Sequence, residues 1–222
     1  MSEPNSTSPA DALEEPTLYN PTVQSAFVVL GFLSEYRGRD IVKDGDRIEY
    51  FYQNEKAAAD SFERYLHKLK EELRLSGPIQ RKKDDGRIAF YSREITALLD
   101  SFYGVDFRYE RTITYPDGRT LRYDICEFSY AAFKPITSAW FKPDEFDPRF
   151  SFLLGAYNRF AKKATFRFSN ATHKAEIVAK LLREVNCDTV IWTSRQNCVP
   201  IQHEIEFVPT EELKSLFALP IA

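Results

Sequence analysis

The residue types that most often perform chemistry are few in this sequence and poorly grouped. The chain has three histidines and three cysteines, and no histidine lies near a cysteine at a metal-ligand spacing. Paired acids occur at residues 144–145 and 211–212; neighbours in sequence do not converge, and acids in a helix's first turn are explained by the helix dipole. No glycine-rich phosphate loop, G-x-S-x-G elbow or H-E-x-x-H motif occurs. The residues alone therefore support no independent enzyme, and they predict neither a cofactor nor a metal site.

Basic residues form the most distinctive polar group. The densest patch falls on a predicted hairpin and the residues after it: Arg81, Lys82, Lys83, Arg87 and Arg93. Alternation along a strand sends Arg81 and Lys83 to one face, where both can contact phosphates. The competing interpretation is a solvated hairpin tip whose charge Asp84 and Asp85 partly cancel.

Two further groups fit either a binding surface or ordinary packing. Four arginines on the predicted hairpin at residues 107–128 alternate with acids, so cross-strand ion pairs explain them equally well. Trp140 and Phe141 lie between prolines, where they either cover the core or contact a partner.

Two similar apolar stretches must position these residues. Residues 28–36 read VVLGFLSEY and residues 152–160 read FLLGAYNRF. A lone glycine in an apolar helix costs roughly 1 kcal/mol relative to alanine, so it needs a packing reason. Close approach of the two helices, one through Gly31 and the other through Gly155, is the simplest such reason.

Helix and hairpin signals fill most of the remaining chain and indicate an α+β fold. Helices are predicted at residues 23–37, 55–75, 93–102, 150–161, 171–185 and 210–217. Hairpins are predicted at 41–52, 79–91 and 107–128, and further strands at 165–168, 189–193 and 202–208. From residue 150 the order of elements starts again, although the second copy lacks a clear first hairpin.

Composition places the chain among folded proteins, with 43% hydrophobic and 14% aromatic residues. The net charge of −3 comes from the acidic first twenty residues, and a near-neutral body neither demands nor excludes nucleic acid. The unpaired cysteines Cys126, Cys187 and Cys198 indicate free thiols in a reducing compartment. Residues 1–10 lack the apolar core of a signal peptide, and no apolar run is long enough for a bilayer. The sequence predicts a cytoplasmic protein without membrane contact.

The duplicated helix–hairpin–helix–hairpin–helix unit, opening each time on a glycine-containing apolar helix, resembles the LAGLIDADG homing endonuclease family. The resemblance covers residues 22–103 and 150–219. It implies pseudo-two-fold duplicated αββαββα units with an extra central β-hairpin, in a monomer with an internal pseudo-dimer. The predicted organisation is an acidic disordered tail (1–20), a first repeat (21–105), an inserted hairpin and linker (106–149) and a second repeat (150–222).

In that family the signature helices pack at the pseudo-dyad, the strands form a saddle over DNA, and an acid at each helix end binds the catalytic metal. Aligning the family's glycine with Gly31 places Tyr36 at the acid position, and a shift of one residue places Arg37 there. In the second copy, aligned on Gly155, the position holds Phe160. None of these side chains binds Mg²⁺, which takes carboxylate or water oxygens.

The resemblance also turns the basic residues into the predicted contact surface of the saddle. The predicted nucleic-acid-binding residues are Arg81, Lys83, Arg87 and Arg93 in the first half and Lys162, Lys163 and Arg167 in the second.

Three functions stay open at this point. The first is a catalytically inactive LAGLIDADG-like protein that binds nucleic acid, with double-stranded DNA as its partner. The second is a protein-interaction or structural module, in keeping with the near-neutral body and the surplus of aromatic residues. The third is a nuclease that still cuts DNA through Glu35, although a helical neighbour points about 100° away from the catalytic position.

Overall fold

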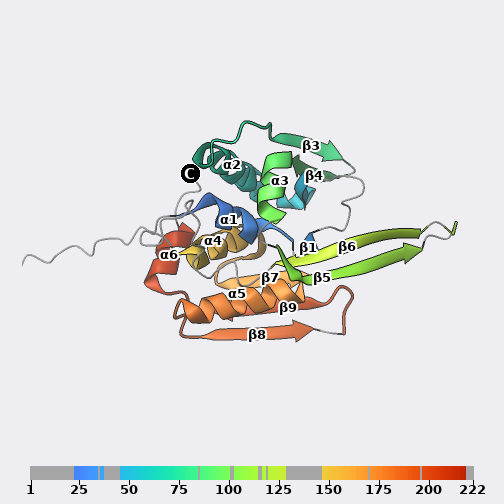
Figure 1. Ribbon diagram of the computed structural model, residues 1–222. Coiled ribbons are helices and arrows are strands. Elements are labelled where there is room, and N and C mark those ends of the chain that lie inside the picture. The colour runs from blue at the N-terminus through green and yellow to red at the C-terminus, as the bar shows by residue number, and fades with distance from the viewer. Residues whose placement is uncertain are drawn as a thin grey trace, which may run out of the picture.

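Two helices, α1 (Ser25–Phe32) and α4 (Pro148–Phe160), lie against each other at the centre of the molecule (Figure 1). A methyl group added to Gly31 would overlap the carbonyl oxygen of Phe152 and lie 2.7 Å from the amide nitrogen of Ala156. One added to Gly155 would overlap the carbonyl oxygen of Val28. The two backbones therefore touch, which confirms the contact predicted from the two glycines.

The computed structural model describes residues 23–34, 36–37, 46–84, 86–100, 103–114, 117–118, 120–128, 147–169, 171–195 and 197–218. The predicted tail, Glu35, Trp140 and Phe141 lie outside these ranges. Within them, no helix combines the length and the apolar character needed to cross a bilayer.

The same order of elements follows each central helix. The first half continues with β2 (Arg47–Tyr52), a short 3-10 helix η1 (Gln53–Glu55), α2 (Lys56–Glu72), β3 (Gln80–Asp84), β4 (Arg87–Tyr91) and α3 (Arg93–Asp100). The second half continues with β7 (Thr165–Ser169), α5 (Thr172–Glu184), β8 (Val190–Arg195), β9 (Gln202–Phe207) and α6 (Glu211–Ala218). The first sheet has the order β2-β4-β3 and the second has the order β7-β9-β8. The predicted duplicated α+β fold is confirmed, whereas the residue boundaries of the two repeats stay a prediction.

A third sheet contains the predicted central hairpin, with the order β1-β6-β5. Its strands are β5 (Tyr103–Thr114) and β6 (Thr120–Phe128), and Figure 1 shows them extending away from the helices. The short strand β1 (Tyr36–Arg37) pairs with β6.

The predicted first hairpin at residues 41–52 is described only in its second strand, because residues 41–45 lie outside the described ranges. This strand, β2, pairs with β4, and the described strand before it, β1, pairs with β6. The pairing of the first predicted strand with β2 stays a prediction.

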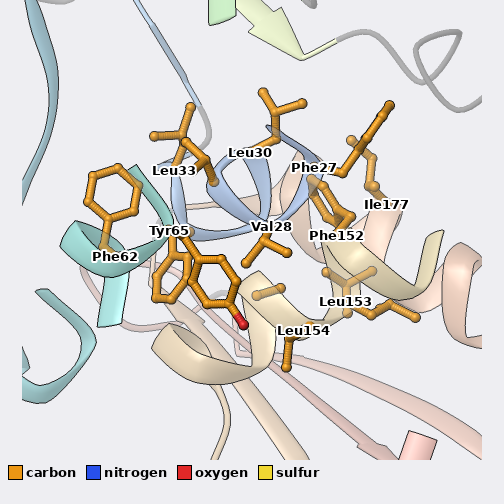
Figure 2. Packing of buried hydrophobic residues seen from close by; sticks show 14 of the residues in the cluster. Phe27, Val28, Leu30, Leu33, Phe62, Tyr65, Phe152, Leu153, Leu154 and Ile177 are labelled. Carbon is orange, nitrogen blue, oxygen red and sulfur yellow. The ribbon is translucent and has the colours of Figure 1, made fainter. Parts of the chain in front are cut away.

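The core forms where helices from both halves meet around α1. All of α1 is buried, and Figure 2 shows Val28 pointing toward Leu153 and Leu154 of α4, with Phe62 and Tyr65 of α2 packed on another side. The helix is shorter than predicted because Leu33 is already extended, with φ −62° and ψ 150°. This early end exposes the last carbonyl oxygens of α1 to the groups described next.

Candidate nucleic-acid interface

Two cations from the second half bind the carboxyl-terminal end of α1. Lys174 of α5 donates to the carbonyl oxygens of Leu30, at 3.3 Å, and of Leu33. Arg159 of α4 donates to the carbonyl oxygen of Phe32 at 2.7 Å. The last carbonyls of a helix lack intrahelical donors and carry partial negative charge. The two cations satisfy this end of the helix and bind the two halves together.

Arg159 also holds strand β2. Its guanidinium donates to the carbonyl oxygen of Tyr50 at 3.1 Å and to the Glu55 carboxylate at 3.0 Å, and it lies 3.3 Å from the Glu49 carboxylate. Only 6% of the Arg159 side chain and 5% of the Glu49 side chain are exposed. A buried ion pair needs such additional hydrogen bonds to offset its desolvation.

The Glu49 carboxylate has no free oxygen in this arrangement. It accepts hydrogen bonds from the Ser34 backbone and hydroxyl groups and, at 2.8 Å, from the Tyr50 amide. Burial by itself raises the pKa of Glu49. The charge of Arg159 and the hydrogen bonds from Ser34 and Tyr50 lower this pKa by more than burial raises it, so the pKa lies below its ordinary value. Glu49 is therefore ionised, and both of its carboxylate oxygens are bound by protein groups.

These groups lie at the end of the helix pair, where the family resemblance placed catalytic acids, and they do not fit a divalent cation. The Phe160 ring packs against Phe168 at 5.1 Å, and the Lys174 ammonium lies 5.2 Å from its centre. Tyr36 and Arg37 belong to the short strand β1. In the described ranges, no group of three or more His, Cys, Asp or Glu residues could hold a metal ion. The cations Arg159 and Lys174 repel Mg²⁺. The Glu49 carboxylate is already hydrogen-bonded on both oxygens, whereas Mg²⁺ requires free oxygen ligands.

The surface that is open to a ligand lies on the other side of β2. Phe51, Ile88 and Phe90 face α2 and are buried, and the Phe62 ring of α2 packs against Phe51 at 5.1 Å and Phe90 at 5.4 Å. Successive residues of a strand point to opposite faces. The residues that point away from α2 form what we call the open face of the first sheet: Arg47, Tyr50, Tyr52, Gln80, Lys82, Arg87, Ala89 and Tyr91, and Asp84 takes the register position opposite Arg87.

Strand register assigns the predicted basic residues to different sides of this sheet. Arg81 lies on the α2 side, where it donates to Asp60 at 2.8 Å and to Glu63. Lys83 shares that side, opposite the buried Ile88, and is exposed at the edge. Only Arg87 of the predicted hairpin residues lies on the open face. Arg93, the first residue of α3, is exposed.

In the second half, the predicted basic residues are exposed but less concentrated. Arg167 is 69% exposed and pairs with Glu204 at 3.0 Å. Lys162 and Lys163 lie exposed in the turn between α4 and β7. The binding roles of all the predicted residues stay predictions.

Several residues of the site were not predicted from the sequence. Lys82 belongs to the predicted basic patch but not to the predicted contact surface, and Tyr50 and Tyr52 are not among the predicted contact residues. Arg159 and Lys174 gave no signal, because their partners lie 104 to 144 residues away in the sequence. No motif spans such a separation.

The fold is similar to solved structures of the homing endonuclease I-DmoI. Mesophilic variants of I-DmoI match over 89% of this chain and 97% of theirs, at 13% identity and a TM-score of 0.49. I-DmoI in complex with DNA and Mn matches over 88% and 97%, at 12% identity and a TM-score of 0.49. No protein-family model and no curated protein matches the sequence. Similarity at 12–13% sequence identity concerns the fold alone, and it assigns this chain neither a ligand nor an activity.

Proposed function

We propose that this protein binds nucleic acid through the open face of the first sheet and does not cleave it with a metal ion. The observation that carries the proposal is the pair Lys82 and Arg87. Both side chains are exposed, and both belong to the face of the sheet that points away from α2. Exposed cations that are held on a sheet are suited to phosphate contacts.

The absence of cleavage is supported by the end of the helix pair. Arg159 and Lys174 occupy the carbonyl end of α1, and the contacts of Glu49 with Ser34, Tyr50 and Arg159 leave it unable to hold a metal. The position aligned with the second catalytic acid is the packed ring of Phe160. A nucleic-acid-binding surface does not depend on these positions, so binding can persist without the chemistry.

Salt-dependent binding tests the proposal. Replacing Lys82 and Arg87 together with glutamine should weaken binding and flatten the slope of log affinity against log salt by roughly one to two units, because two phosphate contacts are lost. The matched control replaces Arg64 and Arg183, exposed arginines on α2 and α5, and should leave the slope unchanged. If neither duplex nor single-stranded DNA or RNA binds at low salt, the proposal is wrong.

A cleavage assay tests the second half of the proposal and covers Glu35, which the structure does not describe. Purified protein with Mg²⁺ or Mn²⁺ should leave supercoiled and linear DNA intact. Metal-dependent cutting that Glu35→Gln abolishes would show an active nuclease and overturn the claim of inactivity.

A protein-interaction module is the second candidate, and exposed apolar residues of the second half favour it. Ile191 of β8 is 53% exposed, and Val199 and Ile201 in the loop before β9 are 103% and 37% exposed. Val199 and Ile201 are close in sequence within that loop, and neighbouring exposed apolar side chains are typical of protein contacts. Failure of all nucleic-acid binding, together with a specific partner lost in Val199→Ser, would favour this function.

A further inference from the structure

The open face of the first sheet combines aromatic rings with cations in a regular pattern. Its cross-strand rows are Tyr52 with Arg87 and Asp84, Tyr50 with Ala89 and Lys82, and Arg47 with Tyr91 and Gln80. Asp84 is the one acidic residue in these three rows. Each row therefore brings an aromatic ring together with a cation on one flat surface.

The rings and the cations are in contact. The Arg87 guanidinium lies 4.8 Å from the centre of the Tyr50 ring and 5.6 Å from that of Tyr52. The Lys82 ammonium lies 4.5 Å from the Tyr91 ring. Tyr50 and Tyr52 meet edge to face at 5.8 Å. Tyr52 is nevertheless 51% exposed, so a large part of its ring is available to a ligand.

The equivalent face of the second sheet has a different composition. Its rows are Thr165 with Glu206 and Ile191, Arg167 with Glu204 and Thr193, and Ser169 with Gln202 and Arg195. It carries no aromatic residue, and its two arginines are matched by two glutamates. The duplicated fold thus carries one face suited to nucleic acid and one face without that chemistry.

We infer that the first half alone forms the nucleic-acid contact and that it takes single-stranded nucleic acid, with an unpaired base stacked on Tyr52 beside Arg87. This inference rests on the proposed function and narrows its ligand. Bases within a duplex are stacked on one another, and a side chain on a sheet cannot reach their faces. A single strand exposes those faces, which aromatic rings and guanidinium planes bind.

Three charged side chains hold the backbone of the two tyrosines in place. Arg159 binds the Tyr50 carbonyl oxygen, Glu49 accepts from the Tyr50 amide, and Glu55 accepts from the Tyr52 amide at 2.8 Å. Ordering a binding surface before the ligand arrives lowers the entropic cost of association. The ion pairs at the end of the helix pair thereby help to fix the positions of the Tyr50 and Tyr52 rings.

The test compares a fluorescent oligothymidylate with a blunt duplex of the same length, using the full chain. The single strand should bind tighter. Tyr52→Leu should weaken its binding about tenfold, because one base loses its stacking partner, while the salt slope stays unchanged. Tyr52→Phe, which keeps the ring, should bind like the unaltered protein.

Ile191→Ala is the matched control, because Ile191 is as exposed as Tyr52 and lies on the equivalent face of the second sheet. It should leave the affinity unchanged, and an unchanged thermal midpoint of each variant shows that the fold is intact. Equal or tighter binding of the duplex, or full affinity in Tyr52→Leu, would overturn the inference while leaving the proposed function in place. No binding of either probe, or of RNA of the same length, would reject the proposed function itself.

Discussion

At the scale of single residues, the two glycines act through the space they leave. A side chain on either would have to displace the backbone of the facing helix, not a flexible side chain. We therefore expect Gly31→Ala to lower the free energy of unfolding by about 3 kcal/mol, the upper end of the range for overpacking. Denaturant unfolding measures this. Gly118→Asn, at a turn with φ 81° and open space around it, is the control and should cost only a few tenths of that amount.

The buried carboxylate of Glu49 gives the second prediction. Glu49→Gln leaves the Arg159 charge without its buried partner, so the free energy of unfolding should fall by about 3 kcal/mol at neutral pH. The pKa of Glu49 is lower in the folded chain than its ordinary value. The ionised carboxylate therefore stabilises the fold above the unfolded-state pKa of about 4.3, and this contribution is lost as the pH falls through the folded value.

The difference in unfolding free energy between the unaltered protein and Glu49→Gln should accordingly narrow below about pH 4. Glu204→Gln is the comparison, because Glu204 pairs with the largely exposed Arg167, and surface pairs contribute little. A Glu49→Gln difference that stays constant down to acid unfolding would contradict the assigned pKa direction.

At the scale of elements, turns and helices were easier to predict than strand orientation. Gly86 and Gly118 adopt positive φ at the predicted hairpin turns, and Thr210 accepts from the Leu213 amide at the predicted start of α6. Strand β3 reads QRKKD and has no apolar residue, so no hydrophobic alternation indicates which side faces the core. Its register with β4 and the contact of Arg81 with the acids of α2 decide it, and that contact is not visible in the sequence.

This orientation of β3 predicts different effects for neighbouring cations. Arg81→Gln should lower the free energy of unfolding by less than about 1 kcal/mol, because its ion pairs with α2 are partly exposed, and should leave the salt slope of binding unchanged. Lys82→Gln should leave stability unchanged and flatten that slope by about 0.7–0.9 units, the value of one phosphate contact. The opposite result would restore the sequence-based assignment, in which Arg81 contacts the backbone.

At the scale of the whole molecule, the duplication was visible in the sequence but the interdependence of the halves was not. The glycines indicated that two helices meet. They did not indicate that α1 is buried along its whole length or that α4 and α5 supply the cations at its end. Those contacts join residues of separate repeats, and no sequence pattern pairs these cations with the end of α1.

The last prediction follows from this interdependence. Expressed alone, residues 21–105 would present the apolar helix α1 to water and leave its terminal carbonyls without Arg159 and Lys174, so this half should not fold. Co-expression with a chain starting at residue 106 should restore a soluble complex, because the buried area around α1 and α4 re-forms between the two chains. Near-ultraviolet circular dichroism and cooperative denaturant unfolding measure the outcome. Cooperative unfolding of the first half by itself would contradict this prediction. It would show that the first repeat is an independent domain that folds without the contacts from α4 and α5.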